Sequence, residues 1–345
     1  MLSGDRLDHM FSSRLWIVLT ICSLALISVV GLFYSRQILK KEGHPSFKNL
    51  PSTEQRKILR DIVERKGVES GWQILIDNAV PPVGDLSYFM GGELFKLYGI
   101  GAATRCPSRF AAGCHAAILA SAIASGGVGS IPELLSICES WGSISFCAHG
   151  LGHGFAHLAS FDRQKALAYC DLYIKNGDQR RCWAGVFQEY ERSSPSDSLT
   201  ETPWGQCESV PKKYQSMCSY AHTEKAWEVK LQLPFIEIAG LCLSTDNFSI
   251  RQGCIFALGR NIARHVPVES IGTQCQSILP KEEGEYCRIA AAEYRAWIRQ
   301  YGWEESTISL CNELPEHTQT VCAAAIQHPD LLRDFETLWS RTFQE

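Results

Sequence analysis

The sequence predicts an all-α protein, an αα-hairpin repeat solenoid with about seven disulfide-stapled repeats, preceded by one transmembrane helix. Three observations lead to this prediction. Fourteen cysteines fall in seven regularly spaced pairs, helical patterns flank the pairs, and a long uncharged apolar segment lies near the amino terminus. The apolar fraction of 45% and the charged fraction of 20% are typical of a folded protein and exclude a largely disordered one.

The first predicted element is a membrane anchor. Residues 15–34 contain no charged side chain and are bracketed by Arg14 and Arg36. A helix of that length spans about 30 Å, the thickness of a bilayer core. The alternative is a cleaved signal peptide, but its apolar region is usually only about 7–15 residues long. We therefore expect a short tail over residues 1–14, an uncleaved signal-anchor over residues 15–34, a basic juxtamembrane linker over residues 35–51 and a repeat domain over residues 52–345.

Two features of the sequence predict opposite orientations for this anchor. The segment after the apolar stretch has more basic residues than the segment before it, which favours a cytoplasmic carboxyl part. The cysteines favour an oxidising compartment instead. Because a small charge asymmetry is a weak signal for a large domain, we expect the soluble part to be periplasmic, extracellular or lumenal.

The cysteines define the repeat. Cys22 lies in the apolar segment and is set aside; the other fourteen are Cys106 and Cys114, Cys138 and Cys147, Cys170 and Cys182, Cys207 and Cys218, Cys242 and Cys254, Cys275 and Cys287, and Cys311 and Cys322. The members of a pair are 8 to 12 residues apart, and successive pairs begin 32 to 37 residues apart. Structural zinc ligands would stand closer together, as C-x(2–4)-C. The pattern therefore predicts seven sequential disulfides in stacked helix pairs.

Each repeat is expected to place a helix before its first cysteine, a polar loop between the cysteines, and a second helix from the second cysteine onward. Three residues after each second cysteine stands a small residue, which allows close helix approach: Ala117, Gly150, Gly185, Ala221, Ala257, Ala290 and Ala325. Six residues after it stands a mostly polar column: Ala120, His153, Gln188, Glu224, Arg260, Glu293 and His328. This polar column is either a solvated face or the lining of a concave binding groove.

Residues outside the cysteine repeats are predicted to cap the array. Helical spacing covers residues 52–66, 69–79 and 85–98, and a break falls at Pro81 and Pro82. A last helix is expected over residues 331–343.

In repeat period and cysteine pairing, residues 85–330 resemble the disulfide-stapled, cysteine-rich Sel1-like helical-repeat proteins. The resemblance implies secretion, an elongated shape and a recognition role. It does not extend to the Sel1 consensus, so no binding residue is carried over from that group.

One segment suggests chemistry. His149, His153 and His157 stand at i, i+4 and i+8, near one face of a helix, and helical His pairs at i, i+4 can bind a divalent metal such as zinc. Register between neighbouring repeats would bring Glu189 beside His153. The candidate metal ligands are therefore His149, His153, His157 and Glu189, and His149, His153 and Glu189 are the candidate catalytic residues.

The interior glycines of this helix, Gly152 and Gly154, suggest that something approaches its backbone closely. Histidines that only pack at a helix interface are the alternative to a functional site. His115 and His222 are weaker candidates. Asn247 begins a glycosylation sequon.

Three functions remain open at this level. The leading one is a membrane-anchored binding or scaffolding protein with a protein or peptide partner. The second is a metal-dependent or acid–base enzyme, and the third is a structural subunit of a membrane complex. No nucleic-acid partner is expected, because 33 basic and 37 acidic residues give a net charge of -4 and no basic block is present.

Overall fold

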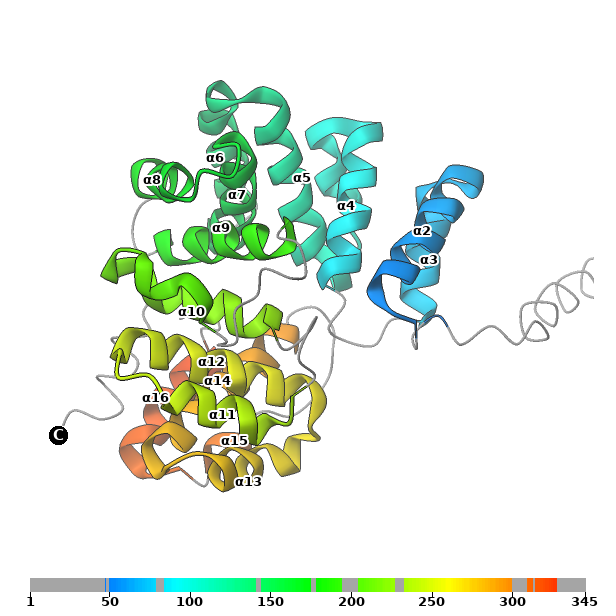
Figure 1. The fold of residues 1–345 in the computed structure, drawn as a ribbon. Helices are drawn as coiled ribbons and strands as arrows, with labels where there is room; N and C mark the ends of the chain where they lie inside the picture. Colours follow the sequence, from blue (N-terminus) through cyan, green and yellow to red (C-terminus); the bar gives the residue numbers. More distant parts are fainter. Residues whose placement is uncertain are drawn as a thin grey trace, which may run out of the picture. The chain divides into compact units, whose positions relative to one another are not determined.

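The computed structural model of the chain describes residue 47 and residues 50–78, 84–140, 144–174, 178–193, 204–226, 233–299, 309–312 and 314–327. Within these ranges every regular element is an α-helix or a 3-10 helix, so the all-α prediction is confirmed (Figure 1). The chain divides into two compact units, Met1–Pro51 and Ser52–Glu345.

The longer helices pack on one another in chain order. They are α4 (Gly84–Tyr98), α5 (Ala111–Gly126), α7 (Ile144–Leu158), α9 (Gln179–Ser193), α10 (Lys212–Ala226), α12 (Phe248–His265), α14 (Lys281–Arg299) and α16 (Glu316–Gln327). Each of these helices contacts the next, from α4 to α16. Figure 1 shows α4, α5 and α7 lying side by side in this row. At its start, α2 (Ser52–Lys66) and α3 (Val68–Asn78) pack on each other and on α4.

Shorter elements lie between the long helices along the chain. They are the 3-10 helices η2 (Gly99–Arg105), η3 (Ser108–Phe110), η4 (Val128–Ser130) and η6 (Gly205–Ser209), and the α-helices α6 (Ile131–Ser140), α8 (Arg163–Tyr173), α11 (Phe235–Leu243), α13 (Val268–Ile278) and α15 (Ser309–Asn312). A short element followed by a long helix recurs along the chain. The predicted repeat is therefore present as a helical repeat-like fold.

The seven predicted disulfides are all present. Each joins the two cysteines of one sequential pair, and the Cα atoms of each bonded pair lie 5.5 to 5.9 Å apart. In every repeat the disulfide joins a short element to the long helix that follows it. In the first repeat the bonded residue, Cys106, directly follows the short element η2. Closing a loop of this length stabilises the fold by roughly 3 kcal/mol in the chain-entropy model.

The expected helix boundaries were wrong in one respect: a long helix begins before its second cysteine, not at it. The helix α12 begins at Phe248, upstream of Cys254, because Asn247 caps it by accepting a hydrogen bond from the backbone N–H of Ile250 at 3.3 Å. The polar residues expected in a loop thus form the first turns of the helix. In two repeats the first cysteine follows or lies in a 3-10 helix, as Cys106 and Cys207 do.

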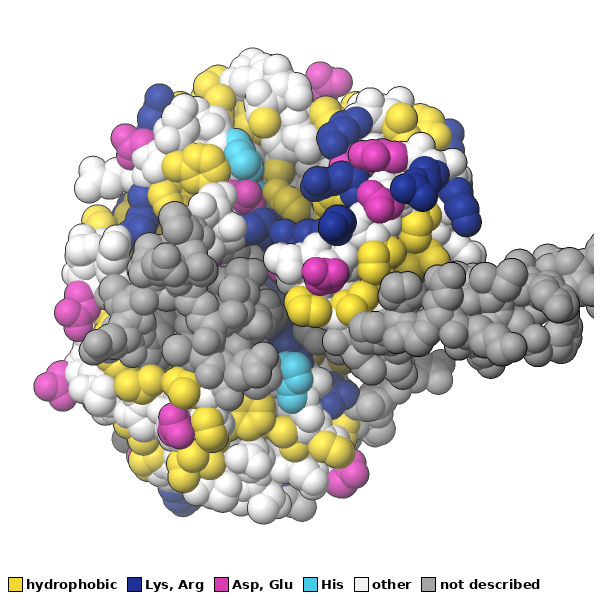
Figure 2. All heavy atoms as spheres, turned by 45° about the vertical axis from the view of Figure 1, so that its right-hand side comes forward, with side chains coloured by type: hydrophobic (Ala, Val, Ile, Leu, Met, Phe, Trp, Pro, Cys, Tyr) yellow, Lys and Arg dark blue, Asp and Glu magenta, His cyan; other side chains and the backbone are white. Residues whose placement is uncertain are grey.

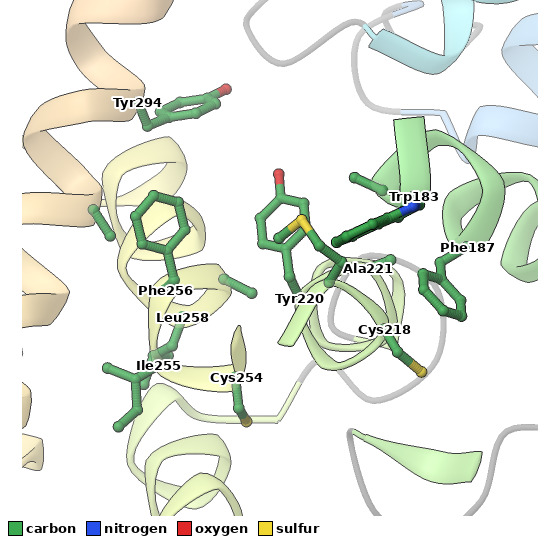
Figure 3. Packing of buried hydrophobic residues seen from close by; sticks show 14 of the residues in the cluster. Trp183, Phe187, Cys218, Tyr220, Ala221, Cys254, Ile255, Phe256, Leu258 and Tyr294 are labelled. Atoms are coloured by element: carbon green, nitrogen blue, oxygen red, sulfur yellow. The ribbon is translucent and has the colours of Figure 1, made fainter. Parts of the chain in front are cut away.

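The small-residue column lies where neighbouring helix backbones come closest. A Cβ atom on Gly185 of α9 would overlap the backbone carbonyl oxygen of His149 in α7. The alanines of the column at positions 117, 221, 257, 290 and 325 are all buried. Figure 3 shows the sulfur atoms of Cys218 and Cys254 on one side of this packing and the hydroxyl groups of Tyr220 and Tyr294 on the other. The long helices therefore have a disulfide side and a polar side.

The predicted anchor over residues 15–34 and the predicted last helix over residues 331–343 lie outside the described residues. Among the residues that are described, no helix has the length and apolar character needed to cross a bilayer.

Candidate functional site

The helix α7 presents its three histidines to α9. Its glycines permit this arrangement, because a Cβ atom on Gly152 would overlap the carbonyl oxygen of Cys182 in α9. On Gly154 a Cβ atom would lie 2.8 Å from the side chain of Ile123 in α5. The close approach expected at these glycines is thus made by the two neighbouring helices.

Glu189 joins two of the histidines. Its Oε2 atom lies 2.9 Å from His153 Nδ1, and its Oε1 atom lies 2.9 Å from His157 Nε2. His153 and Glu189 are only 2% and 3% exposed. The contact between Glu189 and His153 that helix register predicted is therefore present, and it is buried.

Further residues that the sequence did not reveal surround Glu189. Arg192 donates to Glu189 Oε2 at 2.7 Å and to Asp85 Oδ1 at 3.1 Å, and Arg56 donates to Asp85 Oδ2 at 3.1 Å. The Tyr88 hydroxyl donates to Glu189 at 3.4 Å, and its ring lies 5.1 Å from the ring of His153. Arg192 follows Glu189 by three residues and could have been found from helical spacing. Tyr88 and Asp85 are about a hundred residues away and left no local signal.

The electrostatics favour an ionised Glu189 beside neutral imidazoles. Burial alone would raise the pKa of Glu189, but hydrogen bonds from His153 and His157 and the charge of Arg192 hold that pKa far below its usual range. Burial lowers the pKa of both His149 and His153. For His149, the charges of Arg181 and Arg192 lower the pKa further. Unprotonated rings are therefore the stable state of these two histidines.

The hydrogen atoms on the two rings can be assigned from their partners. His149 Nδ1 lies 3.3 Å from the backbone carbonyl oxygen of Arg181, and His153 Nδ1 faces the carboxylate of Glu189. Both partners accept hydrogen bonds, so each Nδ1 atom must donate one. A neutral imidazole has a single ring hydrogen, and both Nε2 atoms are then left with bare lone pairs. These two Nε2 atoms lie only 3.2 Å apart, within hydrogen-bond distance of each other.

The weaker histidine candidates lie elsewhere. His115 in α5 lies with Nε2 3.1 Å from the carbonyl oxygen of Ala103. His222 in α10 lies 3.0 Å from Glu191 and close to the sulfur atoms of Cys207 and Cys218. Those sulfur atoms are bonded to each other and cannot bind a metal as thiolates.

The polar column is buried, so its interpretation as a solvated face was wrong for its described members. Gln188 donates to Glu224 at 2.8 Å, Arg264 donates to Glu224 at 2.7 Å, and Arg260 pairs with Glu293. Each charge meets a counter-charge on a neighbouring helix, which is the condition for burying it. Gln188 alone is half-buried. His328 lies outside the described residues. Figure 2 shows acidic and basic side chains mixed over the face that it displays.

Neither a protein-family model, nor a curated protein, nor a solved structure matches this chain. Its function is therefore argued from the geometry of the α7–α9 site alone.

Proposed function

We propose that the protein binds a divalent metal ion such as zinc between the Nε2 atoms of His149 and His153. The separation of these two atoms, 3.2 Å, is the observation that supports it. Zinc–nitrogen bonds are about 2.0–2.1 Å long, so two nitrogen ligands of a tetrahedral zinc ion lie about 3.3 Å apart. An i, i+4 histidine pair with converging Nε2 atoms matches that edge of a tetrahedron.

The outer contacts of the two rings support the same assignment. Histidine ligands usually donate their second ring N–H to a carboxylate or a backbone carbonyl, which orients the ring. Glu189 accepts from His153 Nδ1 and the carbonyl of Arg181 accepts from His149 Nδ1. In this proposal Glu189 and His157 are positioning residues rather than ligands, which revises their assignment as candidate ligands.

Two alternatives to a metal ion fit these contacts less well. An acid–base pair would hold an additional proton between the Nε2 atoms, which the burial of His153 and the nearby Arg192 oppose. Histidines that only pack would not need both lone pairs to point at one position. A metal ion between the Nε2 atoms would leave the rings of His149 and His153 neutral. It would also give each of their four ring nitrogens a partner.

The metal proposal is tested on the purified full-length chain, stripped with a chelator and titrated with zinc, copper and nickel. Wild type is expected to bind at one site, and His149→Ala and His153→Ala to lose at least about tenfold in affinity. His115→Ala is the matched control, because that histidine lies on α5 and faces Ala103. Equal affinity of wild type and the two α7 variants would refute the proposal.

We also propose the setting of this site: a solenoid repeat domain, held by an uncleaved anchor over residues 15–34, in a periplasmic, extracellular or lumenal compartment. The seven disulfides support an oxidising compartment. Protease treatment of intact cells or spheroplasts should digest the repeat domain. Its complete protection in spheroplasts would contradict a periplasmic or extracellular placement. A protein or peptide partner and a role as a subunit of a membrane complex stay predictions.

A further inference from the structure

The Cys207–Cys218 disulfide differs from the other six in the residue that follows its second cysteine by four positions. This position lies one helical turn further along the same face, and in six repeats it is apolar: Ile118, Leu151, Val186, Leu258, Ala291 and Ile326. In the fourth repeat it is His222, which is buried at 7% exposure. Burying an imidazole costs free energy that an apolar side chain at this position would not. The histidine therefore indicates a role other than filling the core.

His222 lies against the disulfide with the geometry of a metal ligand. Cys218 precedes it by one turn of α10, and Cys207 lies in η6. A ring nitrogen of His222 and the two sulfur atoms all lie within 4.8 Å of one another, and no other three ligand residues meet this condition among those that the structure describes. Two sulfur atoms and a nitrogen bound to one tetrahedral zinc ion lie about 3.5–3.8 Å apart. The three atoms therefore stand close to the positions that one zinc ion requires.

The surroundings of the three side chains suit a site that opens only when the disulfide is broken. Both cysteines are 0% exposed, and Figure 3 shows the sulfur atom of Cys218 on the side of α10 away from the Tyr220 hydroxyl. Glu191 Oε1 lies 3.0 Å from His222 Nε2, and a carboxylate beside a histidine ligand commonly orients its ring. Since η6 is a 3-10 helix of only five residues, its local opening would expose the buried bond to a reductant.

We infer that Cys207, Cys218 and His222 form a redox-dependent metal site, which binds a divalent ion such as zinc once the disulfide is reduced. A dithiol reductant transfers two electrons and two protons to the disulfide, breaks the S–S bond and is itself oxidised to a disulfide. Zinc then displaces the protons of both thiols into water and binds two thiolates and one imidazole nitrogen, with a water molecule in the fourth position. This site shares no residue with the α7–α9 site and does not depend on it.

The test uses the oxidised full-length protein and a water-soluble phosphine, which reduces disulfides with water as the oxygen source and offers zinc no thiolate. The phosphine is raised until both Cys207–Cys218 and Cys242–Cys254 are opened, as judged by alkylation and peptide mass spectrometry without zinc. Added zinc is then expected to slow the alkylation of Cys207 and Cys218 at least about tenfold more than that of the control pair, where Leu258 takes the place of His222. Equal slowing of both pairs would overturn the inference. Zinc bound at the α7–α9 site would affect both pairs alike, so the two proposals are tested separately.

The variant His222→Leu tests the histidine itself. Leucine stands at this position in the next repeat, so the substitution keeps an apolar core residue and removes the ring nitrogen. Zinc should then slow the alkylation of Cys207 and Cys218 no more than that of Cys242 and Cys254. Protection that persists in His222→Leu would show that the two thiolates bind zinc without the histidine and would contradict the assigned site. The comparison of the two pairs in the wild-type chain does not depend on whether this variant folds.

Discussion

At the scale of single residues, the properties of the α7–α9 site follow from burial. Glu189 accepts hydrogen bonds from Arg192, His153 and His157, and these partners keep it ionised although it is only 3% exposed. The carboxylate in turn decides which nitrogen of His153 holds the hydrogen. A single side chain therefore determines where the lone pair of His153 points.

Replacing Glu189 by Gln is expected to weaken zinc binding by about 10–100-fold, because the amide keeps the shape but loses the charge that orients His153. The measurement is a competition titration against a chromophoric chelator. Glu208→Gln, on the exposed part of η6, is the control and should bind zinc like wild type. Unchanged affinity in Glu189→Gln would show that the carboxylate does not orient a metal ligand.

Acidification should destabilise the metal-free protein. Burial lowers the pKa values of His149 and His153 below 6.5, and the partners of Glu189 hold its pKa below 4.5. The unfolded chain therefore takes up protons that the folded chain does not, first below about pH 6.5 and again below about pH 4.5. The free energy of unfolding is therefore expected to decrease as the pH is lowered through each window.

Denaturant unfolding at a series of pH values measures this dependence. The double variant His149→Ala and His153→Ala should show a smaller slope in the upper window, and also a smaller slope in the lower window, because Glu189 loses the hydrogen bond from His153 that lowers its pKa. Some slope should persist in the upper window, because burial also lowers the pKa of His115 and brings that of His222 to about 4. A double variant with the wild-type slope would show that the two rings are not held neutral.

At the scale of elements, close helix contacts depend on residues without a side chain at the crossing point. Gly185 meets the backbone of α7, whereas Gly240 in α11 has no atom within 4 Å of the position that a Cβ atom would take. Both glycines lie inside helices, but only Gly185 lacks space for a methyl group. Comparing alanine variants at the two positions therefore separates the effect of helix contact on stability from the effect of helix propensity.

Gly185→Ala should lower the free energy of unfolding by about 1–3 kcal/mol, because its methyl group would push α9 away from α7. Gly240→Ala should raise it by roughly 0.5–1 kcal/mol, because alanine is the better helix former. Chemical denaturation of both variants gives the two values. A higher free energy of unfolding in Gly185→Ala as well would show that propensity, not contact, controls the helix row.

At the scale of the whole molecule, stability comes from nearest-neighbour contacts and the disulfides that join each short element to its long helix. Each long helix contacts the one before it and the one after it. Helices as short as α8 or α11 are marginal by themselves in water. The disulfides tie these two helices to the long helices that follow them.

Full reduction should therefore lower the melting temperature steeply, since each closed loop contributes roughly 3 kcal/mol in the chain-entropy model. Circular dichroism follows melting, and alkylation with mass spectrometry verifies that all fourteen thiols are free. An unchanged melting temperature after verified reduction would show that helix packing alone holds the repeats.

The sequence by itself determined the features that repeat. Local periodicity predicted α2 at residues 52–66, and spacing predicted all seven cysteine pairs. Register between adjacent repeats brought Glu189 to His153. These features depend on helix period and on neighbours one repeat away, both of which are visible in the order of residues.

Tertiary structure alone decided which polar groups are buried and what meets them. Tyr88 and Asp85 of α4 reach Glu189 and Arg192 of α9, although α5 and α7 lie between these two helices along the chain. No periodic pattern in the sequence encodes that contact. The burial of Arg260 and Glu293 likewise depends on the three-dimensional packing around them. The distance of 3.2 Å between the Nε2 atoms of His149 and His153 depends on the rotamers and ring orientations of the two side chains. Hydrogen-bond partners on another helix determine those orientations.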